Sequence, residues 1–340
     1  MTNTPPPEEL MAMADLLRPA AIRSAATLRL ADHIADGAAT VDELVEATNT
    51  HPEVLPKLLR YLTSIGVLRM STAGRYSLAP LGALLLDDHP AQLRRHLSTD
   101  GPFGRADLGL VRLLHTVRTG QACHEAAFGR SYWEDLNEDP AVAGELQDLI
   151  PGELGWDADL VVNAYDWSTA RRVVDVGGNT GTLLIELVRR HRHLHGTLVD
   201  LQNVARIAGR RFEEAELSHR CEAVIGSFFD PLVPGGDVYL LSAVLADWDD
   251  EHAVRILRRC ADAAGPDGRV LLAEVNLPVD ESQEAAGAAL WLRAIMPAPV
   301  RSVEELKRLG AAAGLRVTWE GPATAVRSLL EFSVAPREDG

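Results

Sequence analysis

The fold is decided by the stretch Val173-Val174-Asp175-Val176-Gly177-Gly178-Asn179-Thr180-Gly181. Its apolar, β-branched beginning predicts a buried strand, its glycines predict a tight turn, and the amphipathic segment 182–192 that follows predicts a helix. A strand, a glycine turn and a helix in this order form the first crevice of a doubly wound α/β sheet. There the backbone can approach a ligand, and the helix N-terminus favours an anion. The stretch therefore predicts a ligand site at the carboxyl edge of a parallel sheet.

The spacing of the glycines excludes two common nucleotide motifs. A GxGxxG fingerprint would need glycine at Asn179 and Thr182, and a P-loop would need a Lys-Ser or Lys-Thr pair after the turn. A carboxylate nevertheless stands where such sheets bind a ribose, because Asp200 ends the second expected strand. The sequence therefore predicts a nucleoside-bearing cofactor, with Asp200 on the ribose hydroxyls and Asp175 orienting the turn.

Strands and helices alternate through the rest of 166–340, as a doubly wound parallel sheet with right-handed crossovers requires. Two closing strands have no helix between them, so they predict an antiparallel hairpin at one edge of the sheet. The expected strands are 172–176, 196–201, 221–225, 237–242, 269–275, 315–319 and 327–334, and the expected helices are 182–192, 204–215, 251–263 and 303–310.

A helix, helix, hairpin order precedes the sheet, which is the order of a winged helix. Such a domain either reads DNA or serves protein assembly. The second helix offers only Lys57 and Arg60 to a phosphate backbone, so we expect a dimerisation and packing domain. The expected elements are a helix that begins with a Thr40–Glu43 capping box, a helix over 53–65 that ends at Gly66, and strands at 67–70 and 75–78.

Composition sets the remaining limits. The chain has 340 residues, 46% of them hydrophobic, and a formal net charge of −16. The length predicts about two globular domains, and we expect a winged-helix domain at 1–100, a helical region at 101–165 and a ligand-binding domain at 166–340. The charge disfavours nucleic-acid and membrane partners. Without a targeting pattern or a long apolar run, the chain is expected in the cytoplasm. Three separated cysteines and the loop 191–195, with alternating histidines, predict neither disulfides nor a metal site.

Five motifs together resemble the S-adenosylmethionine-dependent small-molecule O-methyltransferases, in a bacterial natural-product branch similar to the plant caffeate and flavonoid enzymes. They are DVGGNTG at 175–181, LVDL at 198–201, GSFFDPLVPGGDVYLLS at 226–242, VLADWDDEHAVRILRRC at 244–260 and GPDGRVLLAEV at 265–275. The segments FGRSYWEDL at 128–136 and YDWS at 165–168 also fit that family. The resemblance implies a class I methyltransferase sheet of Rossmann-like type behind a winged-helix dimerisation domain, in a homodimer that methylates phenolic hydroxyls.

The resemblance also implies how S-adenosylmethionine is bound. The glycine turn would hold its methionine part, Asp200 its ribose, and a group of apolar residues its adenine, while Ser227 replaces an acid that would reach the adenine amine. The implied cofactor residues are Asp175, Gly177, Gly178, Gly181, Asp200, Leu201, Gly226, Ser227, Phe228, Phe229, Ser242 and Trp248. The pair Phe228–Phe229 also fits ordinary core packing.

Besides Ser227, three positions depart from the family pattern. Asn179 replaces a glycine, and asparagine tolerates the left-handed backbone that the turn needs. Ala246 stands where the family has its catalytic histidine, and Val300 replaces one of two glutamates that help orient it. The other glutamate position is kept as Glu274. The substituted histidine would remove the proton of the acceptor hydroxyl, which contributes about 10²–10⁴-fold to the rate.

These departures leave three interpretations open. In the first, the chain still methylates an oxygen, using an acidic phenol or another base. In the second, the fold catalyses a different tailoring step, such as hydroxylation, decarboxylation or cyclisation, with bound S-adenosylmethionine. In the third, it is a winged-helix regulator with a degenerate methyltransferase domain, which the charge disfavours. The candidate bases are Asp247, Glu274, His115 and His124.

The acceptor is expected to be a small planar aromatic molecule. Apolar and aromatic side chains suited to it occur in 285–299, with Trp291 and Met296, and at Phe103, Phe128, Trp133 and Trp156. Helix packing or a dimer interface explains the same residues equally well. No particular ring system is selected by the sequence.

Overall fold

The computed structural model describes residues 6–139, 141–142, 145–146, 158–275, 282–296, 301–324 and 327–335. The chain divides into two compact units, Met1–Leu108 and Gly109–Gly340. The helices between residues 109 and 164 thus cluster with the sheet, and the expected division at residues 100 and 165 stays a prediction. Trp156 and the segment 297–299 lie outside the described residues.

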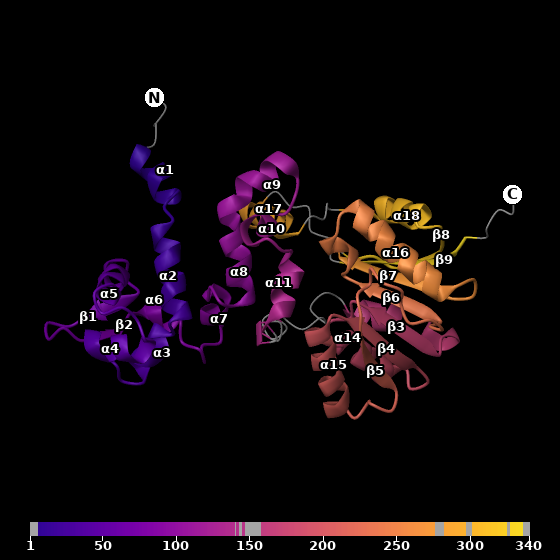
Figure 1. Ribbon diagram of the computed structural model, residues 1–340, viewed down its shortest axis with the longest axis horizontal. Helices are drawn as coiled ribbons and strands as arrows, with labels where there is room; N and C mark the ends of the chain where they lie inside the picture. The colour runs from indigo at the N-terminus through magenta and orange to yellow at the C-terminus, as the bar shows by residue number, and fades with distance from the viewer. Residues whose placement is uncertain are drawn as a thin grey trace. The chain divides into compact units, whose positions relative to one another are not determined.

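The first unit is helical with one two-stranded hairpin (Figure 1). The capping box at Thr40 and Glu43 is confirmed, because each residue's side chain accepts from the other's backbone N–H. Gly66 follows the second helix of the winged-helix pattern with a φ of +78°, which favours glycine. The elements are α1 Pro7–Met13, α2 Leu17–Thr27, α3 Leu30–Ala35, α4 Val41–Thr48, α5 Leu55–Ser64, β1 Leu68–Met70, β2 Tyr76–Leu78, α6 Pro80–Ala83 and α7 Leu93–Leu97, followed by α8 Pro102–Gly109.

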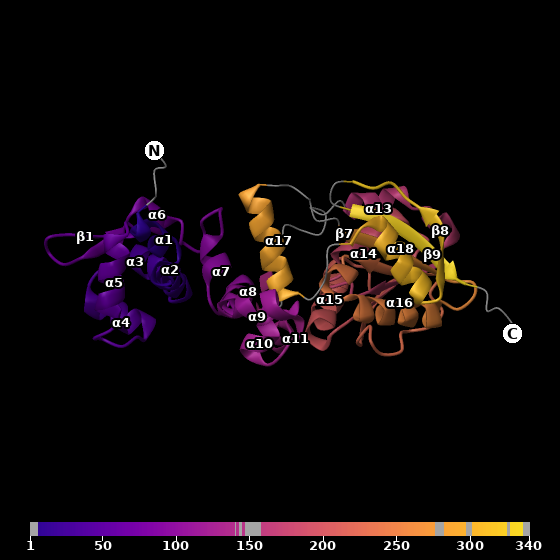
Figure 2. The same cartoon turned by 90° about the horizontal axis from the view of Figure 1, so that it is seen from above.

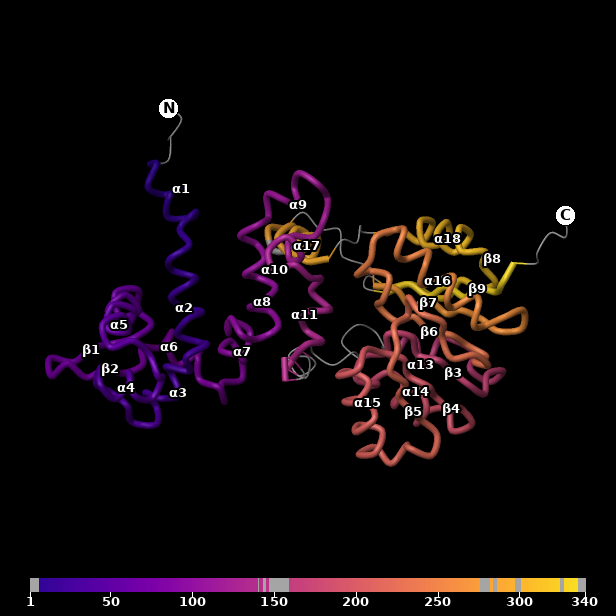
Figure 3. Tube along the Cα trace, in the orientation of Figure 1, coloured from indigo at the N-terminus to yellow at the C-terminus, as the bar shows by residue number. Residues whose placement is uncertain are grey.

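In the second unit, several helices precede the sheet in sequence. A late helix, α17 (Gln283–Ile295), packs against α9 and α10 although it follows them by more than 150 residues in sequence, as the trace in Figure 3 shows. Arg293 of α17 donates to the carbonyl oxygen of Gly120 and ties the two segments together. The early elements are η1 Leu110–Arg112, α9 Leu113–Thr119, α10 Cys123–Phe128, α11 Tyr132–Glu138, α13 Ala158–Ala164 and η3 Trp167–Thr169.

Seven strands form one mixed sheet in the order β5-β4-β3-β6-β7-β9-β8. The first five are parallel, whereas β9 pairs antiparallel with both β7 and β8, so the predicted antiparallel hairpin at one edge is confirmed. The strands are β3 Arg172–Val176, β4 His195–Asp200, β5 Cys221–Ile225, β6 Val238–Ser242, β7 Arg269–Val275, β8 Leu315–Glu320 and β9 Arg327–Val334. The expected strand boundaries agree with these to within a residue.

Helices cover both faces of the sheet. Side chains along a strand point to the two faces in turn, and in the parallel strands the side chains on both faces are mostly apolar, so both faces need a covering layer. One core holds Val173, Leu198 and Leu240 against α13, α14 (Thr182–Arg190) and α15 (Gln202–Glu214). The other holds Val174, Val199 and their neighbours against α16 (Asp250–Ala264) and α18 (Val303–Ala312). Figure 2 shows α13 and α16 on opposite faces. Within the described residues, the sheet is therefore covered on both faces.

Candidate active site at the carboxyl edge of the sheet

The predicted site residues come together because the parallel strands end side by side. Val176 at the end of β3 pairs with Val199 of β4, while Asp175 pairs with Leu240 of β6. The glycine turn after β3 therefore lies between Asp200, which ends β4, and Ser242, which ends β6. This is the edge at which ligands bind in open α/β sheets.

The glycine turn has the backbone that the sequence predicts. Gly177, Asn179 and Gly181 have φ values of +72°, +55° and +78°, so the expectation that Asn179 accepts a left-handed conformation is confirmed. Gly178 is needed for a different reason: a Cβ there would come within 2.4 Å of Asp175 Oδ2. At Gly178 the turn therefore has no room for a side chain.

Asp200 is fixed by the turn itself. Its Oδ2 accepts from the N–H of Asn179 at 2.8 Å and its Oδ1 from the N–H of Leu201 at 2.7 Å. Burial raises the pKa of this carboxyl to about 6, although the two N–H groups favour the charged form. Each oxygen keeps acceptor capacity for a further donor, which suits the two hydroxyls of a ribose.

Aromatic rings stand beside the turn. Trp248 meets Phe228 and Phe229 with ring centroids 5.7 Å and 4.8 Å apart. Phe228 also faces Gly177, where a Cβ would lie 3.3 Å from its ring. Ser227 directs its Oγ to the N–H of Phe229 at 3.2 Å. Together with Gly226, whose N–H bonds the carbonyl of Asp200, these residues give an apolar wall next to a carboxylate, the surface that an adenosyl group requires. The residues present therefore fit the cofactor that the sequence predicts.

Two acidic side chains, Asp247 and Glu274, lie deeper at this edge. Glu274 is buried and accepts from the N–H of Leu245 at 3.0 Å and from that of Val275 at 2.9 Å. Burial raises the pKa of Glu274 to about 7, opposed by the positive charges of Arg301 and Arg327. Burial, and then the charge of Glu274, raise the pKa of Asp247 well above its ordinary range. Because each charge disfavours the other, the pair holds a proton near neutral pH.

Arg301 was missed by the sequence reasoning. Its side chain is 4% exposed and donates to the carbonyls of Leu245 and Trp248 at 2.6 Å and 2.5 Å and to Asp250 Oδ1 at 2.9 Å. It therefore fixes η4, the short helix Leu245–Asp247 that carries Ala246. The one signal in the sequence is its place directly before Ser302, whose capping box begins α18.

Arg327 was also missed as a site residue. It begins β9 and its Nη1 donates to Ser242 Oγ at 2.8 Å and to the carbonyl of Ala273 at 3.0 Å. Because β9 is antiparallel to β7, its first residue lies at the edge where the parallel strands end. Ser242 thus directs its hydroxyl toward Arg327, a contact that the sequence did not indicate.

The histidines proposed as alternative bases have separate surroundings. His124 is fully buried, with its Nε2 3.3 Å from Asp135 Oδ2 and its ring 4.7 Å from that of Phe128. His124 is therefore packed beside Asp135 within the helical segment. His115 is partly exposed on α9.

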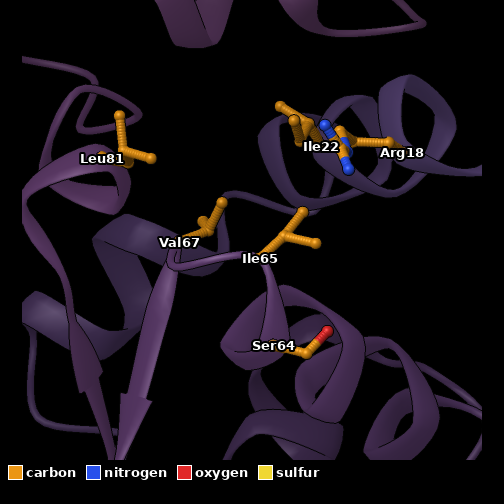
Figure 4. A pocket seen from close by; sticks show the side chains of 6 residues that line it. All are labelled: Arg18, Ile22, Ser64, Ile65, Val67 and Leu81. Atoms are coloured by element: carbon orange, nitrogen blue, oxygen red, sulfur yellow. The ribbon is translucent and has the colours of Figure 1, made fainter. Parts of the chain in front are cut away.

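Phe103, another candidate for the acceptor surface, belongs to the first unit and stacks on His96 with centroids 4.8 Å apart. The first unit also holds a hollow of about 340 Å³ lined by Arg18, Ile22, Ser64, Ile65, Val67 and Leu81, and Figure 4 shows these side chains. None of the predicted site residues lines it. Across the described residues, no group of three His, Cys, Asp or Glu side chains could hold a metal ion. Nor does any helix in the described ranges have the length and apolarity to cross a membrane.

Comparisons with known proteins identify the family of this chain. An O-methyltransferase domain model matches residues 111–316, and an O-methyltransferase dimerisation domain model matches residues 11–88. The chain is 44% identical over 326 residues to a 2,7-dihydroxy-5-methyl-1-naphthoate 7-O-methyltransferase of Streptomyces carzinostaticus, covering 95% of this chain and 97% of the relative. It is 40% identical to the aclacinomycin 10-hydroxylase RdmB of Streptomyces purpurascens, covering 95% and 87%.

A solved structure gives the same result for the fold. The O-methyltransferase NcsB1 from neocarzinostatin biosynthesis, in complex with S-adenosyl-L-homocysteine and 1,4-dihydroxy-2-naphthoic acid, matches with a TM-score of 0.80 and 43% identity over 96% of this chain and 98% of that one. Another structure of NcsB1 holds S-adenosylmethionine. The chain therefore belongs to the S-adenosylmethionine-dependent O-methyltransferases of bacterial natural-product biosynthesis, with a dimerisation domain ahead of the methyltransferase domain.

Proposed function

We propose that this chain transfers a methyl group from S-adenosylmethionine to a phenolic or enolic hydroxyl of an aromatic, polyketide-like natural product. The observation that carries the proposal is the glycine turn with Asp200 fixed beside it and an aromatic wall on the same edge. The relative at 44% identity, a 2,7-dihydroxy-5-methyl-1-naphthoate 7-O-methyltransferase, supports an aromatic acceptor of this class. A planar apolar acceptor with one reactive oxygen is therefore the substrate class to test.

Each part of the site has a binding role in this proposal. The turn at Gly177, Gly178 and Gly181 would hold the methionine part of S-adenosylmethionine, and Asp200 would accept both ribose hydroxyls. Leu201, Phe228, Phe229 and Trp248 would contact the adenine, with Gly226 and Ser227 beside them. When bound, this cofactor supplies an electrophilic methyl group on a sulfonium.

The proton of the acceptor has two routes in this chain. The side chain of Ala246 cannot accept a proton. Its two neighbours in sequence lead to carboxylates: Asp247 follows it directly, and the N–H of Leu245, which precedes it, donates to Glu274. An ionised Asp247–Glu274 pair can take a proton, because the raised pKa of Glu274, about 7, matches neutral pH. An acceptor that is already partly ionised needs no base at all.

Positioning explains why the loss of a histidine does not abolish the reaction. A general base contributes about 3–5 kcal/mol to lowering the barrier, whereas holding two reacting groups in line contributes about 7–11 kcal/mol. Arg301 supports such positioning, since it fixes both ends of the turn that carries Ala246 and Asp247. We therefore expect methyl transfer to acidic phenols to be retained.

Incubation with isotopically methyl-labelled S-adenosylmethionine and a panel of hydroxynaphthoates and aromatic polyketides tests the proposal. Label in an O-methyl product, together with release of S-adenosyl-L-homocysteine, is the expected result. If a tailored product forms without label, methyl transfer is not the reaction.

A second candidate function is supported by one comparison. The relative at 40% identity is a 10-hydroxylase, so this fold also serves a tailoring step other than methylation. Ala246, where the resembled family has a histidine, is compatible with that change. Mass spectrometry of unlabelled products, looking for an added oxygen or a lost carboxyl group, distinguishes this candidate in the same experiment.

We also propose that the protein is a homodimer. The matched dimerisation domain begins at residue 11, and α1 and the start of α2 leave large apolar side chains exposed. These side chains are 60–80% exposed in the single chain, and a second copy would cover them. They are Leu10, Met11, Met13, Leu16 and Leu17. Sedimentation at low micromolar concentration should give the mass of two chains, and the variant L16E should shift it toward one.

A further inference from the structure

Helix α11 (Tyr132–Glu138) carries two buried polar atoms that lack a hydrogen-bond partner among the described residues, Trp133 Nε1 and Asn137 Oδ1. The two residues are four positions apart, so they share one face of the helix. One atom is part of an N–H donor and the other is a carbonyl acceptor. Unpaired polar atoms cost free energy when buried, and native proteins keep them mainly where a ligand or water completes the bonds.

The position of α11 relates these atoms to the cofactor site. Asn203 in the first turn of α15 donates its Nδ2–H to the carbonyl oxygen of Asn137 at 2.5 Å. Asn203 follows Asp200 and Leu201 by two to three residues, and both of these lie at the carboxyl edge of the sheet. Packing of α11 against α15 therefore places the end of α11 that carries Asn137 beside the first turn of α15, which follows Asp200 directly, and both helices are labelled in Figure 1.

We propose that Trp133 and Asn137 form a further part of the cofactor site and bind the adenosyl group of the methyl donor, with Trp133 donating to it and Asn137 accepting from it. The inference rests on the proposed role of Asp200, but it does not depend on whether methyl is transferred. Ribose hydroxyls and adenine offer both acceptors and donors on one rigid frame, which matches a donor and an acceptor on one helix face. Asp200 can only accept, so an N–H donor from α11 complements it.

Isothermal titration of the full chain with S-adenosyl-L-homocysteine, without any aromatic acceptor, tests this assignment. The variant W133F keeps a ring and removes the N–H, while N137L keeps the size and removes the amide. We expect each variant to weaken the affinity for S-adenosyl-L-homocysteine by about 3- to 10-fold, the loss typical of one hydrogen bond. The control W319F removes an indole N–H from β8, the outermost strand, and should leave the affinity unchanged.

Thermal unfolding of the ligand-free variants separates binding from a structural role. Removing an unpaired buried polar atom should leave the melting temperature unchanged or raise it, so W133F and N137L should bind less tightly without being less stable. The inference is overturned if both variants bind S-adenosyl-L-homocysteine as tightly as the parent does. That result is expected if Trp133 Nε1 and Asn137 Oδ1 bond only to water or to the aromatic acceptor. A parent that does not bind S-adenosyl-L-homocysteine would overturn the cofactor site as a whole.

Discussion

Replacing Glu274 by glutamine should change how the stability of the second unit depends on pH. Burial raises the pKa of Glu274 from an ordinary 4.5 to about 7. The folded chain thus binds this proton more tightly than the unfolded chain does. The resulting stability is complete below pH 4.5 and is lost as the pH rises through 7. At about 1.4 kcal/mol per pKa unit the total is roughly 3 kcal/mol, of which about 2–3 kcal/mol is lost between pH 5 and pH 8.

Glutamine cannot ionise, so the variant E274Q should lack this slope. It should also ease the ionisation of Asp247, because the charge of Glu274 is one of the causes that raise the pKa of Asp247. At low pH the variant should be somewhat less stable than the parent, since an amide can accept from only one of the two N–H groups that the carboxyl now satisfies.

Urea unfolding at pH 5, 6, 7 and 8 measures the effect. All six tryptophans lie between residues 133 and 319, so tryptophan fluorescence reports the second unit. Groups other than Glu274 and Asp247 titrate alike in parent and variant and largely cancel in the difference. The control E222Q changes an exposed glutamate of β5 and should follow the parent. Parallel pH profiles for the parent and E274Q would refute the buried, proton-holding carboxyl.

Three further variants test the glycine turn, the position of Ala246 and the role of Arg301. G178A should lose about 1–3 kcal/mol of stability, measured by thermal unfolding, because its Cβ would meet Asp175 Oδ2 at 2.4 Å, whereas G209A, with its nearest atom 3.9 Å away, should be neutral or stabilising. A246H should raise kcat at least tenfold for a phenol of ordinary pKa, measured by release of S-adenosyl-L-homocysteine, and an unchanged rate would remove the proton-transfer role from this position. R301M removes a positive charge that lowers the pKa of Glu274, so the rise of activity with pH should move to higher pH. R301K should restore part of the original pH profile. An unchanged pH profile in R301M would show that Arg301 has only a structural role.

Local pattern was sufficient to predict most of the sheet and the cofactor turn. The run Val173–Val176 is mostly β-branched, the glycines follow it directly, and short apolar runs recur in the later strands, so the strands and the turn are local properties of the chain. Asn179 is an example: its tolerance of positive φ was predicted from its side chain and is confirmed at +55°. Asp200 could be placed at the tip of its strand for the same reason, since the end of an apolar run is visible in the sequence.

Only the tertiary structure decided what surrounds the acidic pair. Arg301 and Arg327 are distant from Glu274 in sequence, and neither belongs to a periodic pattern that reveals its partner. Arg327 reaches the site because β9 runs antiparallel beside β7, and Arg301 reaches it because α18 packs on α16. Likewise, the pKa of Glu274 depends on burial between strands and on charges brought from other elements. The sequence by itself determined the fold and the edge of the sheet at which a ligand site is expected, because these follow from neighbouring residues, whereas the electrostatics of the site arise from long-range packing that no local pattern encodes.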